Sequence, residues 1–129
     1  MTIRLGFAVG FGSYGFSVMW QYQNTPAPGY YQCFVNNASL YNAGVLNTGG
    51  SAPFTNDWIY AKITNTGGGN AFFEISDLNT GYSDSYNYTG GSISTGLIMI
   101  PLVTVTNPES NNKNVEIDYL SIKYKSSRT

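Results

Sequence analysis

The sequence predicts an all-β fold, an antiparallel two-sheet β-sandwich or jelly roll of about nine strands with no substantial helix. Apolar and polar residues alternate with the period of two that half-buried strands show, and no segment has the 3.6-residue period of a helix. Asparagine, glycine and proline interrupt these runs at short intervals, as the turns of antiparallel sheets require. Eleven tyrosines and seven phenylalanines also favour pleated surfaces. At 129 residues the chain is expected to be one domain, residues 1–129, with its own hydrophobic core.

An opening hairpin is expected near the N-terminus. Apolar residues occupy every second position over 3–11 and again over 14–22, and Gly12 and Ser13 between the runs supply a tight turn. The segment 24–29 contains prolines and a glycine, which predicts a loop. The strands that follow are expected at 30–35, 40–46, 57–64, 70–76, 82–88, 97–106 and 115–124.

The last two of these strands are expected to close the fold as a hairpin. They are joined by the Asn-rich loop 107–114 and followed by a tail, 125–129. Pro101 lies in the first arm and indicates an edge strand or another irregularity, because proline cannot donate a ladder hydrogen bond. The second arm contains two apolar sets that are out of phase by one residue, namely Val115, Ile117 and Tyr119, then Leu120, Ile122 and Tyr124. A bulge near Tyr119 is therefore needed to bring both sets onto one buried face.

Glu116 and Asp118 in this second arm suggest a possible chemistry. Residues two apart in a strand project from the same face, and the same spacing occurs in retaining β-glucanases of jelly-roll fold. Their mechanism needs another carboxyl group about 5 Å from the nucleophile. Those enzymes supply it about four or five residues after the first acid, where this chain has Leu120 and Ser121. Neither side chain is a general acid, so Glu116 and Asp118 are predicted to form a polar strand face.

The composition excludes several functions. The chain has no histidine, which removes Ser-His and Cys-His triads and most zinc sites, so we expect no enzyme, no cofactor and no metal. Six basic and seven acidic residues leave a net charge of −1, so neither nucleic acid nor a membrane is an expected partner. No apolar run reaches the roughly 18 residues of a membrane helix. The single cysteine, Cys33, rules out an intrachain disulfide and predicts an ordinary buried thiol.

A tyrosine-rich segment is the main candidate for a binding site. Tyr82, Asp84, Tyr86 and Tyr88 occupy even positions of one predicted strand and would share a face. Aromatic rings beside a polar acceptor hold sugars by stacking and oriented hydrogen bonds. The alternative is that these tyrosines pack within the sheet or against another subunit.

Three other patterns have simple structural explanations. Residues 10–15 fit G-x-G-x-x-G, but a strand follows them where a dinucleotide site needs a helix. The turn at 77–81, with Asp84 beyond it, offers oxygen ligands for calcium, yet it lacks the terminal Glu, and an Asx turn explains the same residues. Trp20 and Trp58 lie in alternating strands and are predicted to belong to the core.

Several short motifs occur in an order that resembles a known family. They are GFAVGFG, GYYQCFVNNASLYNAGV, DWIYAKITN, FFEI, LIMIPLVTVTN and VEIDYLSIKY. Together, over roughly residues 6–124, they resemble the concanavalin A-like jelly-roll domains of bacteriophage structural proteins, of tail-fibre, head-fibre or capsid-decoration type. Two features depart from that family. The pattern begins almost at Met1, and Ser13 replaces the usual acidic residue after the opening glycines, so no ligand role of that acid carries over.

The resemblance implies functions as well as a fold. The first hypothesis is a non-catalytic virion protein at the particle surface, a capsid decoration or a head- or tail-fibre domain. It would form a homo-oligomer, expected to be a trimer, and contact other capsid or tail proteins. The second is a receptor- or carbohydrate-binding module of a tail fibre that binds a host-surface glycan through Tyr82, Tyr86 and Tyr88 or through the 24–29 loop. A glycan hydrolase is the third and least favoured.

Overall fold

Eight strands make up most of the part of the chain that the structure, a computed structural model, describes. The described residues are 2–10, 13–23, 30–36, 38–42, 58–94, 96, 98–106 and 115–123. Over these ranges there is no helix, and therefore no helix suited to cross a membrane. The strands are β1 (Thr2–Gly10), β2 (Ser13–Gln23), β3 (Tyr30–Val35), β4 (Ala38–Asn42), β5 (Ile59–Gly67), β6 (Asn70–Asp77), β7 (Ser83–Tyr88) and β8 (Ile100–Thr106).

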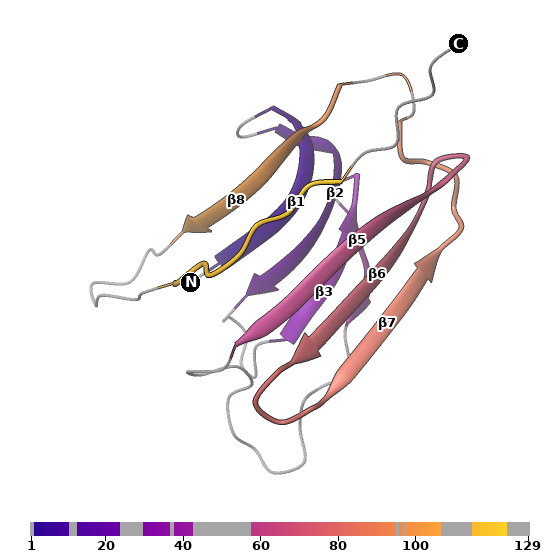
Figure 1. Ribbon diagram of the computed structural model, residues 1–129. Coiled ribbons are helices and arrows are strands. Elements are labelled where there is room, and N and C mark those ends of the chain that lie inside the picture. Colours follow the sequence, from indigo (N-terminus) through magenta and orange to yellow (C-terminus); the bar gives the residue numbers. More distant parts are fainter. Residues whose placement is uncertain are drawn as a thin grey trace.

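The strands form two antiparallel sheets. The larger has the order β4-β3-β2-β1-β8, and the smaller has the order β5-β6-β7. Figure 1 shows the two sheets as separate layers, with β5, β6 and β7 in front of the larger sheet. The prediction of an all-β protein built from two antiparallel sheets, consistent with a β-sandwich, is confirmed.

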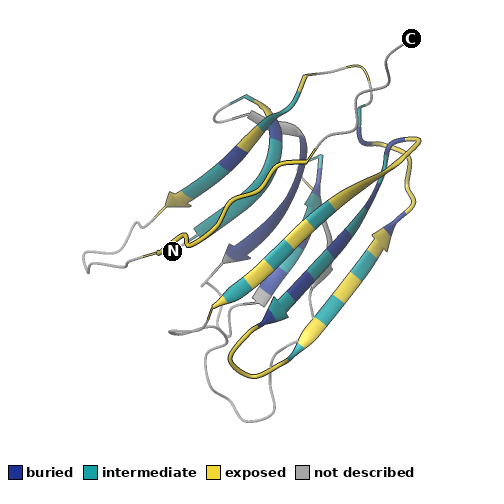
Figure 2. Cartoon of the chain, viewed as in Figure 1, coloured by how far each residue is buried: buried dark blue, intermediate teal, exposed yellow. Residues whose placement is uncertain are grey.

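The main core lies between the sheets, where apolar side chains alternate with outward-facing ones, as Figure 2 shows for β6. Its fully or nearly buried members include Val18, Trp20 and Tyr22 of β2, Tyr31, Cys33 and Val35 of β3, and Ala71, Phe73 and Ile75 of β6. In all three strands, the buried residues are the ones that the alternation in the sequence places on the apolar face. The hydrophobic effect of closing the two apolar faces against each other is what holds the layers together.

Trp20 sits at the centre of this core, as predicted. It is 0% exposed, and its ring makes edge-to-face contacts with Tyr31 at 6.4 Å and with Phe73 at 5.5 Å between ring centroids. Its Nε1–H donates a hydrogen bond of 3.3 Å to the backbone carbonyl of Lys62 in β5. The indole therefore joins both sheets, and its one polar group is satisfied.

A second, smaller core covers the opposite face of the larger sheet. It consists of Ala8, Met19 and Leu102, with Phe34 packed against them. Gly6 makes this packing possible, because a Cβ there would lie 2.3 Å from the carbonyl oxygen of Val18 and 2.6 Å from Cα of Met19. Gly6 also has a φ of +155°, which side-chain-bearing residues rarely adopt.

Asn36 connects the two sheets at one end of the sandwich. It lies in the turn between β3 and β4 with a φ of +47°, a left-handed conformation that asparagine tolerates better than most residues. Its backbone N–H donates to the carbonyl of Ser17 at 2.8 Å. Its side-chain Nδ2 donates to the backbone carbonyl of Ser92 and, at 3.1 Å, to Oγ of the same residue. The Ser92 hydroxyl is also hydrogen-bonded to the Tyr88 hydroxyl.

The prediction of a ninth strand at 115–124 is wrong over residues 115–123. These residues form no strand, and all of them are exposed. The reason lies in the two out-of-phase apolar sets, since neither half of the segment can be buried on a sheet without exposing the other. The predicted strand 40–46 instead begins at Ala38, and its last residues, 43–46, lie outside the described ranges. The same is true of the loops 24–29 and 107–114 and of the tail 125–129.

Pro101 is placed as predicted. It belongs to β8, which ends the strand order of the larger sheet and pairs with β1 alone among the described strands. The opening hairpin is also confirmed, with Gly10 of β1 opposite Ser13 of β2.

Candidate functional site

The even-numbered face of β7, the predicted sugar platform, points into the sandwich. Tyr88 lies opposite Ala71 and is 8% exposed, and Tyr86 lies opposite Phe73 and packs against the main core. The residues do share one face, as the spacing predicts. However, their rings are occupied with packing against other core side chains and offer little surface to a sugar.

Asp84 lies on the same inward face, at the edge of the sheet. Its Oδ2 accepts a hydrogen bond of 3.4 Å from the Tyr82 hydroxyl, and its Oδ1 accepts one of 2.8 Å from the N–H of Ser85. Burial, and secondarily the charge of Asp84, raise the pKa of the Cys33 thiol well above its ordinary value. The thiol therefore stays protonated at neutral pH and is a core group, not a nucleophile.

The outer surface of β5-β6-β7, which we call the small-sheet face, carries a different set of side chains. The strand register arranges them in three rows across the sheet. The first row is Tyr60, Ser76 and Ser83. The second row is Lys62, Glu74 and Ser85. The third row is Thr64, Phe72 and Asn87.

Trp58 and Tyr60 form an aromatic end of the small-sheet face. Each ring residue is 47% exposed, so the prediction of Trp58 as a core residue is wrong. Trp58 lies two positions before Tyr60, and the residue between them, Ile59, packs against the main core, so Trp58 belongs to the outward set. Leu78, which is 65% exposed, donates its backbone N–H to the carbonyl of Trp58 at 2.9 Å. Apolar surface is thus concentrated at this end.

The turn after β6 holds Trp58 in place. The backbone N–H of Trp58 donates to Oδ1 of Asn79 at 3.2 Å. The turn itself is fixed by Asp77, whose Oδ1 accepts hydrogen bonds from the N–H groups of Asn79 (2.8 Å) and Thr80 (3.0 Å). This is the Asx turn given above as the alternative to a calcium loop. In the described part of the chain, no group of three or more side chains is arranged to hold a metal ion.

An ion pair occupies the middle of the small-sheet face. Nζ of Lys62 lies 2.7 Å from Oε2 of Glu74, and both side chains are open to solvent. The hydrogen bond to Glu74 and its negative charge raise the pKa of Lys62. An exposed pair of this kind contributes little to stability, but it presents donor and acceptor atoms side by side.

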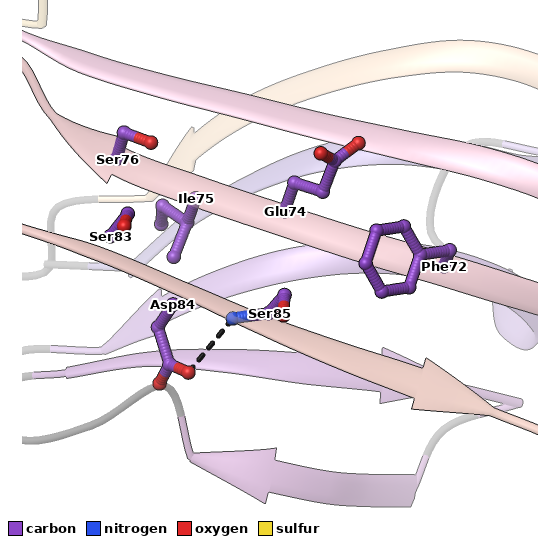
Figure 3. Close-up of a pocket in the computed structure, with 7 residues that line it drawn as sticks. All are labelled: Phe72, Glu74, Ile75, Ser76, Ser83, Asp84 and Ser85. Carbon is purple, nitrogen blue, oxygen red and sulfur yellow. Dashed lines mark hydrogen bonds between the residues drawn. The ribbon is translucent and has the colours of Figure 1, made fainter.

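A shallow hollow of about 350 Å³ lies beside this ion pair, between β6 and β7. Figure 3 shows Ser76 and Glu74 of β6 along its upper side and Ser83 and Ser85 of β7 next to them, while Asp84 points to the opposite side of the sheet. The hollow is lined mainly by hydroxyl and carboxylate groups, which suits a small polar ligand or one ring of a larger one.

A further polar row crosses the outer face of the larger sheet. Nε of Arg4 donates to Oε1 of Gln21 at 2.6 Å, and Nε2 of Gln21 donates to Oε1 of Gln32 at 3.4 Å. Gln21 is 4% exposed. These groups satisfy one another across three strands, so the row stabilises the sheet.

Glu116 and Asp118, the other residues singled out in the sequence, are exposed and lie outside any strand. They are polar surface residues as predicted, but they do not belong to a strand face. The structure brings neither of them into the small-sheet face.

The chain matches no protein family model, no curated protein and no solved structure. Fold and site together define a β-sandwich protein that exposes one sheet face with an aromatic end and a polar, charge-balanced centre.

Proposed function

We propose that this chain is a non-catalytic binding module that holds a carbohydrate on the small-sheet face. The observation that carries the proposal is the exposure of Trp58 and Tyr60, 47% each, at one end of a face whose other side chains, apart from Phe72, are polar. Exposed aromatic rings are costly in water, and a cluster of them often marks a binding surface. Stacking on the apolar face of a sugar ring is a common function of such a surface.

The rest of the small-sheet face supplies the hydrogen bonds that such a ligand needs. A sugar ring stacked on Trp58 or Tyr60 places its hydroxyl groups toward Lys62, Glu74 and the hollow between β6 and β7. The ammonium group donates, the carboxylate accepts, and the serine hydroxyls do both. Because the two charges cancel, the face favours a neutral sugar.

The same geometry argues for binding over hydrolysis. A glycosidase needs two carboxyl groups about 5 Å apart, or about 6.5–9.5 Å apart, flanking the bond to be cleaved. In the described rows of the small-sheet face Glu74 supplies one carboxylate, and it is paired with Lys62. Asp84, the nearby acid, points to the other side of the sheet.

The setting that we propose for this module is the surface of a bacteriophage particle, as a capsid decoration or a head- or tail-fibre domain with a concanavalin A-like jelly-roll fold. Its support is the order of the sequence motifs. A glycan-binding face is compatible with this setting, because a phage particle has to attach to the surface of its host cell.

A glycan array followed by titration calorimetry of the best ligand tests the function. We expect Trp58→Ala and Tyr60→Ala each to weaken binding about fivefold, because each removes a stacking surface worth on the order of 1 kcal/mol. Tyr82→Ala is the matched control, since Tyr82 belongs to the platform predicted from sequence and not to the small-sheet face. If Tyr82→Ala abolished binding while Trp58→Ala left it unchanged, the proposal would be overturned.

A further inference from the structure

Residues 115–123 have the sequence of a strand but not the environment of one. Figure 1 shows them in yellow as a plain ribbon without an arrow. Five large apolar side chains of this segment are exposed: Val115 (36%), Ile117 (58%), Tyr119 (74%), Leu120 (62%) and Ile122 (46%). Soluble monomers rarely leave so many neighbouring apolar residues in water. The segment therefore has the character of a surface that a partner covers.

Both faces of the segment are apolar, which limits what can cover it. Ile117 and Leu120 are three positions apart, so in an extended strand they point to opposite sides. A strand of this type is stable where protein lies on both sides of it, as at an interface between subunits. Laid on the edge of its own sheet alone, it would still leave one apolar face in water.

β8 offers the edge that fits this strand best. It ends the larger sheet, so one row of its backbone groups lacks a strand partner among the described residues. It has no charged residue, and Val105 within it is 44% exposed. The other strand edges in the described part are more polar, since β7 consists of Ser, Asp, Asn and Tyr, β5 includes Lys62, and β4 consists of Ala, Ser, Leu, Tyr and Asn. Glu116 and Asp118 would thus meet no carboxylate of β8.

We propose that residues 115–123 add as an extra strand to the edge of β8 in a second copy of this chain. Pro101 lacks an N–H and limits the pairing to the residues after it, Leu102–Thr106. If each copy gives its residues 115–123 to the β8 edge of another copy, every subunit makes this contact. The backbone hydrogen bonds of the added strand and the five exposed apolar side chains would then belong to one interface. In a closed dimer or trimer built in this way, the β8 edge of every subunit is paired.

Sedimentation equilibrium of the full chain over a concentration series, combined with hydrogen–deuterium exchange, tests this proposal. We expect a dimer or a closed trimer, and we expect the amides of 115–123 to become protected as the oligomer forms. Ile117→Asp places a charge in the interface and should raise the dissociation constant at least about tenfold. Thr66→Asp introduces the same charge at an exposed position of β5 and should leave the dissociation constant unchanged.

Three results would overturn the proposal. The first is a monomeric mass at every concentration. The second is an oligomer that Ile117→Asp and Thr66→Asp affect equally. The third is protection of 115–123 that does not depend on concentration, which would mean that the segment pairs within its own chain. The exchange measurement on the unmodified protein decides the question even if Ile117→Asp fails to fold. The proposal is independent of carbohydrate binding, so either can fail alone.

Discussion

Among the glycines that the structure describes, Gly6 has the least room for an added Cβ. The atoms nearest to an added Cβ belong to the backbone of the neighbouring strand β2, so they cannot rotate away. Gly10, in the same strand, has no atom within 4 Å of the corresponding position. The packing of β1 against β2 therefore requires a glycine at position 6, whereas no neighbouring atom requires one at position 10.

We expect Gly6→Ala to lower the free energy of unfolding by roughly 1–3 kcal/mol or more, because overpacking of this kind forces backbone shifts. Gly10→Ala is the control and should change it by less than about 1 kcal/mol. Urea denaturation followed by circular dichroism measures both. Equal effects of the two substitutions would show that the contact between Gly6 and β2 does not matter.

Cys33 makes stability depend on pH on the alkaline side. Its folded-state pKa is raised above the ordinary value of 9.0, first by burial and then by Asp84. Above pH 9 the thiol ionises in the unfolded chain but not in the folded one, so the unfolded state binds fewer protons and stability falls as pH rises. Below pH 9 this effect is absent.

Urea denaturation at pH 7 and pH 10 measures this dependence. We expect the unmodified protein to lose more stability between the two values than Cys33→Ala does. Tyr31 and Tyr22, whose pKa values burial also raises, are present in both proteins and cancel in the comparison. An equal loss in the two proteins would contradict the assignment to Cys33.

At the scale of the elements, the turn between β3 and β4 does more than reverse the chain. Its Asn36 reaches Ser92 in the segment after β7, so a turn of the larger sheet is tied to a loop of the smaller one. The turn between β5 and β6 meets the same loop, where the N–H of Ile93 donates to the carbonyl of Gly69 at 3.1 Å. The segment 90–93 is therefore where the ends of both sheets are joined.

Two substitutions separate the backbone role of Asn36 from its side-chain role. Asn36→Gly keeps the left-handed conformation and removes the hydrogen bonds to Ser92, which should cost about 1–2 kcal/mol of unfolding free energy. Asn36→Ala removes the bonds and adds strain, so it should cost about 1 kcal/mol more than Asn36→Gly. Thermal unfolding of the two variants gives the difference. If Asn36→Gly were neutral, the tie to Ser92 would contribute nothing.

At the scale of the whole molecule, the sequence predicts which residues share a face better than it predicts where that face points. The period of two located seven of the strands closely and β4 in part, and it put Trp20 in the core. The same period grouped Tyr82, Asp84, Tyr86 and Tyr88 correctly, but the direction of a face is decided by the opposite sheet, which a single strand does not encode. In β7 the polar face of Ser83, Ser85 and Asn87 turned outward, as its weaker hydrophobicity requires.

Two of the wrong predictions concern Trp58 and residues 115–123. Trp58 is predicted to belong to the core because it lies in an alternating strand, yet its neighbour Ile59 occupies the inward position. Residues 115–123 have the local pattern of a strand, but their two apolar sets are out of phase, so one sheet face cannot bury both. In both cases the local pattern does not fix which residues are buried, because that depends on the sheet that packs against them.

The pairing of β1 with β8 has a consequence for how the molecule is made. Thr2 lies opposite Thr106, so the larger sheet joins residues that are more than a hundred positions apart in the sequence. During synthesis β1 can pair with β2 early, but its other side has to wait until β8 has left the ribosome. Contacts of such long range slow folding, and the nascent chain carries an open sheet edge until β8 has been made.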